Sequence, residues 1–216
     1  MSKFNEDSRV KIPALLHLTR LGYSYLSLDH SEWDKRSNIF SRQLEEALLR
    51  INRDLRQEDL PGLLNEIQLD LQNEDLGKAF HKRLTARSGV RLIDFNDHTN
   101  NTYHVVTELP FENGEDSFRP DITALINGLP LVIIEVKKPM NDGGVLEERW
   151  RMDRRHANRK FRHFFNLIQL HVFSNNMEYE EAAIDPVQGA FYAASTYGEA
   201  HFNYFREERA AELASL

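Results

Sequence analysis

The spacing of apolar residues predicts helices through the N-terminal third of the chain. Leucines cluster between Leu15 and Leu21, directly before a glycine, which often ends a helix. Apolar residues recur at helical spacing over 40–55, and again over 63–71 and 76–84. We expect Pro61-Gly62 to form a turn between the first two of these segments. The pattern therefore predicts a helical part covering residues 1–86.

The apolar period changes from helical to alternating near residue 89. Two β-prone runs flank Asn127-Gly128, the strongest short signal for a β-hairpin. A long amphipathic helix is predicted over 145–167 and a charged helix over 203–216. This order of helices and strands predicts an α/β fold with a central mixed sheet. Strands are predicted at 90–94, 103–109, 119–126, 131–138, 169–174 and 189–194.

Composition limits the class of protein. Apolar residues make up 41% and charged residues 28% of 216 residues, which suits one globular domain over 1–200, with its sheet-containing core at 87–200. No apolar run approaches the ~20 residues of a membrane helix. Cysteine is absent, so disulfides are excluded and a reducing cytoplasm is the expected location. Residues 201–216 are expected to begin a connection to a further segment.

Charge is distributed unevenly along the chain. The net charge of −7 argues against a protein that binds nucleic acid with its whole surface, so any such contact needs a local basic patch. One cluster of basic residues falls within the predicted helix 145–167. Its functional interpretation is contact with DNA phosphates, and the alternative is a solvated or docking helix face. On a continuous helix, one stripe would contain Arg151, Arg155, Arg159 and Arg162.

The hairpin around Asn127-Gly128 carries the candidate chemistry. Alternation in a strand puts Glu135 and Lys137 on one face and Val132, Ile134 and Val136 on the other, which is apolar. A two-residue loop would turn Asp121 toward the apolar face. A three-residue loop, 127–129, would place Asp121 opposite Glu135. We expect the second register, because a lone carboxylate among aliphatic side chains is costly to bury.

Two adjacent carboxylates need a positive charge between them. Hard oxygen ligands of this kind suit Mg²⁺, which makes Asp121 and Glu135 the candidate metal ligands. Lys137 could orient a water nucleophile or stabilise negative charge in the transition state of phosphodiester hydrolysis. The non-catalytic alternative is a surface ion pair between Glu135 and Lys137, with Asp121 capping a turn.

The same segment supports a family resemblance. Arg119-Pro-Asp-Ile-Thr-Ala-Leu-Ile-Asn-Gly-Leu-Pro-Leu-Val-Ile-Ile-Glu-Val-Lys-Lys-Pro139 closely resembles the PD-(D/E)xK nuclease motif in the restriction (R) subunit of type I restriction enzymes. Segments resembling the family's flanking sequences occur in the expected order, at 43–52, 90–95 and 172–176. The resemblance implies a restriction-endonuclease-like core in which Asp121 and Glu135 bind the metal and Lys137 is the catalytic lysine.

The resemblance also implies partners. Such subunits cut double-stranded DNA with Mg²⁺, in a complex with methylation and specificity subunits. An ATP-driven, helicase-like motor follows on the same polypeptide. This chain contains no Gly-x-x-x-x-Gly-Lys-[Ser/Thr] loop, so we do not expect it to bind ATP itself.

The sequence departs from the family pattern in one place and leaves another open. Many relatives carry a Gln-x-x-x-Tyr pair on the helix after the lysine, and the stretch 149–163 has none. Some nucleases of this class also use an acid from the first helix, for which Glu6, Glu45 and Glu46 are all candidates. Two hypotheses follow: an Mg²⁺-dependent endonuclease domain, or a non-catalytic DNA-binding or subunit-docking module on the same scaffold.

Other types of catalytic site lack their motifs. None of the nine histidines falls in His-Glu-x-x-His, and without cysteine a structural zinc site is not expected. No Gly-x-Ser-x-Gly elbow indicates a serine hydrolase.

Overall fold

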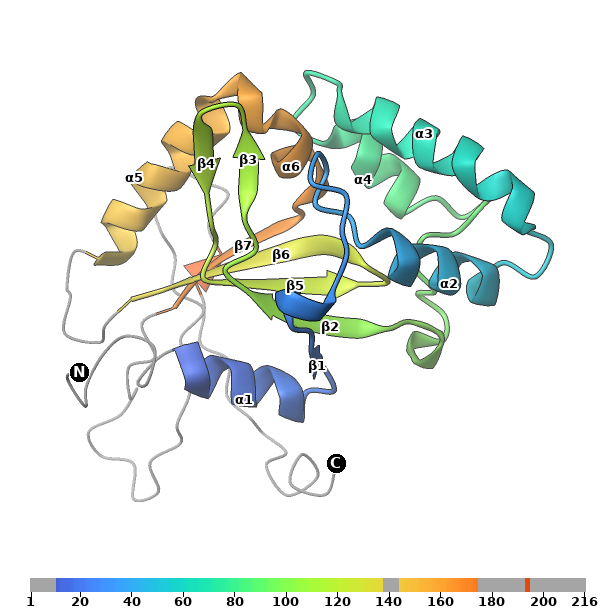
Figure 1. The fold of residues 1–216 in the computed structure, drawn as a ribbon, viewed down its shortest axis with the longest axis horizontal. Coiled ribbons are helices and arrows are strands. Elements are labelled where there is room, and N and C mark those ends of the chain that lie inside the picture. The colour runs from blue at the N-terminus through green and yellow to red at the C-terminus, as the bar shows by residue number, and fades with distance from the viewer. Residues whose placement is uncertain (1–10, 138–143, 175–192, 195–216) are drawn as a thin grey trace.

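A computed structural model of the chain describes residues 11–137, 144–174 and 193–194 (Figure 1). The predicted helix 203–216 and the candidate acid Glu6 lie outside these residues, as does most of the predicted strand 189–194. Within them, no helix is long and apolar enough to cross a membrane.

A mixed sheet of six strands forms the centre of the described part, in the order β1-β2-β5-β6-β7-β8. The β1–β2 and β6–β7 pairs are parallel and the other neighbours are antiparallel. This architecture confirms the predicted α/β class and mixed sheet, and it is compatible with a restriction-endonuclease-like core. The strands are β1 (Ser24–Tyr25), β2 (Tyr103–Thr107), β5 (Ile122–Ile126), β6 (Leu129–Val136), β7 (Leu170–Ser174) and β8 (Ala193–Ala194).

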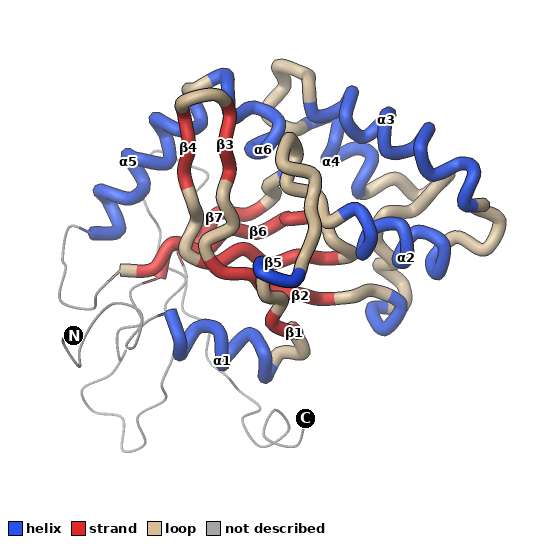
Figure 2. Tube along the Cα trace, in the orientation of Figure 1, coloured by secondary structure: helices blue, strands red, loops and turns tan. Residues whose placement is uncertain are grey.

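Helices cover both faces of the sheet (Figures 1 and 2). On one face, Ala14 and Leu18 of α1 (Ile12–Arg20) pack in one apolar cluster with Ile134 and Val136 of β6. On the other, Ile133 packs among phenylalanines that follow α5. The alternation read from the sequence therefore holds along β6, and its apolar face does pack on a helix. The helices of the second face are α2 (Ser41–Ile51), α3 (Leu60–Leu71), α4 (Lys78–Leu84), α5 (Gly144–Ala157) and α6 (Arg162–Leu167).

The β5–β6 hairpin has a different register at its turn from the one predicted. Ile126 pairs with Leu129, so the loop is the two-residue turn Asn127-Gly128 and not the three-residue loop. Both turn residues have positive φ, 53° and 77°, as the tightest hairpin turns require. The ladder then pairs Leu125 with Pro130 but Ala124 with Val132, which leaves one extra residue on β6. This β-bulge restores the opposition that the longer loop was expected to provide.

The segment 90–94, predicted as a strand, is irregular. Leu92 and Ile93 are buried in the core, but side-chain amides bond to the backbone of this segment in place of a neighbouring strand. Asn52 Oδ1 accepts from the Arg91 N–H at 2.8 Å, and Asn127 Nδ2 donates to the Leu92 carbonyl at 2.9 Å. An apolar run alone cannot show which partner its backbone will find.

Three further elements differ from the prediction. Helix α3 begins at Leu60, so Pro61 lies in its first turn, where proline's missing N–H costs nothing. The predicted helix 145–167 breaks at Asn158, whose side chain accepts the Lys160 N–H and starts a 3₁₀ turn, η5 (Arg159–Phe161). A hairpin that was not predicted, β3 (Phe111–Asn113) and β4 (Asp116–Phe118), stands on the α5–α6 face of the sheet (Figure 2).

Candidate active site

Asp121 and Glu135 form a carboxylate pair at the end of the hairpin remote from its turn. The ladder ends with Ile122 opposite Ile134, so one further step sets Asp121 opposite Glu135. The Val136 N–H donates to Oδ2 of Asp121 at 2.8 Å, which fixes that carboxylate against β6. The carboxylate of Asp121 lies close enough to Glu135 to raise its pKa. The structure thus brings the two predicted acids together.

The surroundings of Glu135 favour its neutral form. The residue is 4% exposed, and burial is the main cause that raises its pKa, to about 8. The nearby carboxylates of Asp121 and Glu148 raise the pKa further, and the Arg155 guanidinium partly opposes them. At neutral pH in the absence of metal, Glu135 therefore keeps its proton, which a divalent cation could displace.

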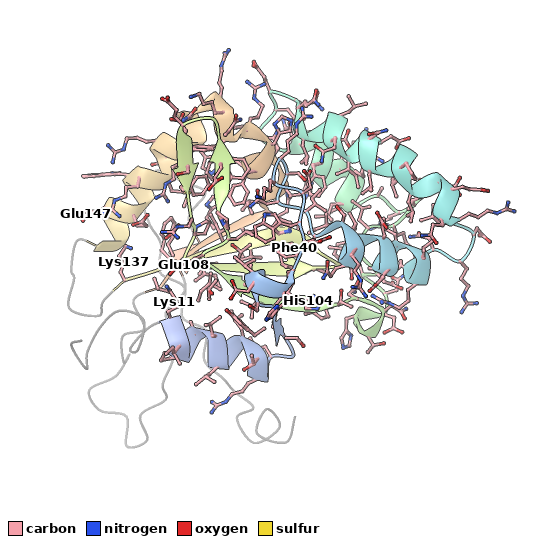
Figure 3. All side chains as sticks on the ribbon, viewed as in Figure 1. Lys11, Phe40, His104, Glu108, Lys137 and Glu147 are labelled. Carbon is pink, nitrogen blue, oxygen red and sulfur yellow. The ribbon has the colours of Figure 1, made fainter. Side chains whose placement is uncertain are left out.

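Lys137 lies just after β6, at the same end of the sheet (Figure 3). Its ammonium is 3.1 Å from Oε2 of Glu148, and its side chain is only 17% exposed. Glu148 is on α5 and is 1% exposed. Sequence reasoning missed this acid. The available signal was its spacing, with Arg151 and Arg155 at i+3 and i+7 on the same helix face.

Arg155 connects α5 to β6. Its Nη1 is 3.4 Å from Oε1 of Glu135 and 3.5 Å from Oε1 of Glu148. The guanidinium carbon also lies 4.9 Å from the ring centre of Phe118, a cation–π distance. Arg155 was predicted to contact DNA, and in the structure it contacts Glu135 and Glu148. These two acids and Asp121 are called the carboxylate cluster below.

The other predicted DNA-contacting arginines are spread over three elements. Arg151, on α5, is half-exposed and pairs with Glu148 at 2.9 Å. Arg159 begins η5, is exposed and lies 3.9 Å from Glu74, with which Arg162 of α6 also pairs. The break at Asn158 means that they do not form one helical stripe. Arg151 lies nearest the carboxylates, because it shares Glu148 with Lys137.

The candidate acids on the first long helix lie far from this site. Glu45 and Glu46 belong to α2, and the Phe40 N–H just before that helix bonds to the Gly128 carbonyl in the hairpin turn at 2.9 Å. The carboxylate pair is at the opposite end of β6, about 20 Å away by the strand rise. Glu46 pairs with Arg42 on its own helix. The structure does not bring either acid to Asp121.

A hollow lies between α2, α3 and the 89–100 loop, with a volume of about 1110 Å³. Charges of both signs line it, among them Arg50, Asp54, Glu58 and Arg91. The 89–100 loop that borders it bonds to the hairpin turn, through the Leu92 carbonyl and Asn127, and the lining contains no residue of the carboxylate cluster.

The donor set of the candidate site suits a hard cation. Within the described residues, no group of three or more His, Asp or Glu side chains is arranged to hold a metal ion. Asp121 and Glu135 would therefore need water or phosphate oxygens as further ligands, which is the usual coordination of Mg²⁺.

Asp121, Glu135 and Lys137 thus lie at one end of the central hairpin of a mixed sheet, and comparison of the sequence with known proteins identifies the family. The family model described as "Type I restriction enzyme R protein N terminus" matches residues 3–180. The chain belongs to this family.

Relatives of the chain are named as endonuclease subunits of type I restriction enzymes. A putative type I restriction enzyme MjaIXP endonuclease subunit of Methanocaldococcus jannaschii is 30% identical, over 65% of this chain and 16% of its own length. The type I restriction enzyme HindI endonuclease subunit of Haemophilus influenzae is 28% identical, over 50% of this chain and 12% of its own. The chain thus spans less than a fifth of the length of these relatives.

Proposed function

We propose that this chain is the endonuclease domain of a type I restriction enzyme and hydrolyses phosphodiester bonds of double-stranded DNA with Mg²⁺. The observation that carries the proposal is the carboxylate pair. Asp121 and Glu135 come together on a buried hairpin, where two like charges destabilise the sheet unless a cation binds between them. A fold that needed only stability would gain nothing from this arrangement.

Asp121 and Glu135 would hold the metal. When bound, Mg²⁺ supplies Lewis acidity toward a phosphoryl oxygen and lowers the pKa of a coordinated water. The Val136 N–H holds one oxygen of Asp121 in place, so this ligand is oriented before a metal arrives. Burial of Glu135 excludes water and strengthens its interaction with a cation.

Lys137 would act on the scissile phosphate. Its position two residues after Glu135 puts its ammonium on the metal-binding side of the strand. There it can orient a water nucleophile and stabilise the negative charge that develops on the phosphoryl oxygens. Lysine suits this role because its compact ammonium carries three donors on a flexible stem.

DNA would approach over the basic surface of α5 and η5. Arg151 is 49% exposed, Arg159 is 82% exposed and Lys160 is 52% exposed, so they can reach a phosphate backbone. Such contacts supply affinity without sequence specificity. In the full-length protein, cleavage would be coupled to ATP-driven translocation, and methylation and specificity subunits would complete the complex.

The test is plasmid cleavage by the full-length protein in its complex, with Mg²⁺ and ATP. We expect Asp121→Asn and Glu135→Gln to abolish cleavage and Lys137→Ala to slow it strongly but measurably, because all three groups act at the reacting phosphate. Glu147→Gln is the matched control, since this exposed residue of α5 carries the same charge outside the cluster. Unchanged cleavage in all three site variants would leave only a DNA-binding or docking module.

A binding experiment on the chain itself complements the cleavage assay. Mg²⁺ or Mn²⁺ should raise the melting temperature of the wild-type chain, because a ligand that binds only the folded state stabilises it. Asp121→Asn should remove this rise.

A further inference from the structure

Glu148 is a buried acid that neither binds the metal nor contacts the phosphate in the proposed function. It is 1% exposed on α5, facing the catalytic strand. A buried carboxylate is costly unless cations and hydrogen-bond donors surround it. The structure supplies three cations, and one of them is the proposed catalytic lysine.

The contacts of Glu148 divide between its two oxygens. Oε2 lies 3.1 Å from Lys137 Nζ and 2.9 Å from Arg151 Nη1. Oε1 lies 3.5 Å from Arg155, whose same nitrogen is 3.4 Å from Glu135. Glu148 thus contacts the lysine directly and a metal ligand through one arginine.

Lys137 needs such a partner because of where it lies. It follows the last residue of β6, so the sheet ladder does not hold its backbone, and four rotatable carbons carry its ammonium. The carboxylate that the structure pairs with this ammonium is Glu148, although Glu135 is two residues away on the same face. A helix that is itself packed on the sheet through Met152 therefore fixes the lysine.

We propose that Glu148 is a positioning residue of the nuclease site, which holds the Lys137 ammonium beside the carboxylate pair. The proposal rests on the proposed function, since it requires that Lys137 act in cleavage. Removing an outer partner that orients a catalytic group costs about 10- to 100-fold in activity. We expect a loss in that range for Glu148.

The experiment measures single-turnover cleavage by the full-length protein in its complex, at saturating Mg²⁺ over a range of DNA concentrations. Glu148→Gln has nearly the wild-type shape but no charge. It should lower the maximal rate about 10- to 100-fold and leave the DNA concentration for half-maximal rate within about twofold. Glu147→Gln, the adjacent exposed control, should cleave at the wild-type rate.

A second variant separates geometry from charge and from folding. Glu148→Asp keeps the negative charge that balances Arg151 and Arg155, but it withdraws the carboxylate by about 1.5 Å, one carbon–carbon bond. It should fold like the wild type, with a similar melting temperature, and still cleave more slowly. Wild-type rates in both Glu148 variants, with Lys137→Ala slow, would overturn the positioning role alone.

The double variant Lys137→Ala/Glu148→Gln provides the decisive readout. If Glu148 acts through the lysine, the double variant is no slower than Lys137→Ala by itself. If the rate loss of the double variant equals the product of the two single losses, Glu148 has a general structural effect, and the proposal is overturned. Full cleavage by Lys137→Ala would instead overturn the proposed function of the site, and the positioning role with it.

Discussion

Replacing Glu135 with glutamine should stabilise the metal-free protein while removing its metal site. Burial and two neighbouring acids raise the pKa of Glu135 from 4.5 to about 8. The folded chain therefore retains a proton that the unfolded chain releases between about pH 4.5 and 8. The free energy of unfolding falls as pH rises through this window, and the loss is complete above it. Glutamine keeps the shape of the protonated acid and cannot ionise.

The pKa difference sets the size of the effect. At about 1.4 kcal/mol per pH unit, an interval from 4.5 to about 8 corresponds to at most about 5 kcal/mol. Relaxation of the site and entry of water reduce this, so we expect Glu135→Gln to be more stable than the wild type by about 2–3 kcal/mol at pH 9. At pH 5, where the wild-type acid is protonated, the two should differ by less than about 0.5 kcal/mol.

Urea unfolding at pH 5, 7 and 9 in the presence of EDTA measures this difference. Titrating groups that do not interact with Glu135 are common to both proteins and cancel in the comparison. Glu147→Gln provides an exposed control whose difference from wild type should not depend on pH. The reasoning is refuted if Glu135→Gln is less stable than the wild type at pH 9. That result would mean that Arg155 and Lys137 outweigh burial and stabilise the ionised acid.

Three further predictions concern the turn, His171 of β7 and the basic surface. Gly128→Ala should destabilise the fold by at least about 2 kcal/mol in urea, because a Cβ there would lie 2.5 Å from the Phe40 carbonyl at a φ of +77°. Burial, with a smaller effect of His156, lowers the pKa of His171 to about 3, so stability should fall as pH drops below 6.5. Between pH 7 and 4, His171→Phe should lose about 1–2 kcal/mol less free energy of unfolding than the wild type. An equal loss in the two proteins would contradict this prediction. Arg159→Ala should lower the slope of log affinity against log salt for DNA by about 0.9, and an unchanged slope would exclude a phosphate contact.

Much of the hairpin follows from local sequence. Asn127-Gly128 accepts positive φ at both turn positions, and strict alternation along β6 separates Glu135 from the aliphatic face that packs on α1. These are short-range properties, fixed by turn geometry and by the two-residue period of a strand. They explain why the two acids could be assigned to one site from the sequence.

The tertiary structure decided how those acids meet. The two-residue turn alone would have put Asp121 opposite Ile134, and the bulge on β6 shifted the register by one residue. A bulge leaves no clear mark in an alternating sequence, because it depends on how the strand packs against the layers around it. The predicted opposition was therefore correct, although the loop expected to produce it was wrong.

Glu148 and Arg155 show most clearly which properties come from the sequence and which from tertiary packing. In the sequence they belong to a charged helix whose arginines suggested a solvent-facing stripe, and nothing local sets that helix against β6. Met152, one turn after Glu148 on the same helix, packs against Ile133 and Phe173 of the sheet, and this packing turns the Glu148 face inward and buries a carboxylate beside Lys137. Sequence determined which residues carry charge and which strand face they share. Only long-range packing determined which charges meet, because the free energy of burying an ion depends on partners from distant parts of the chain.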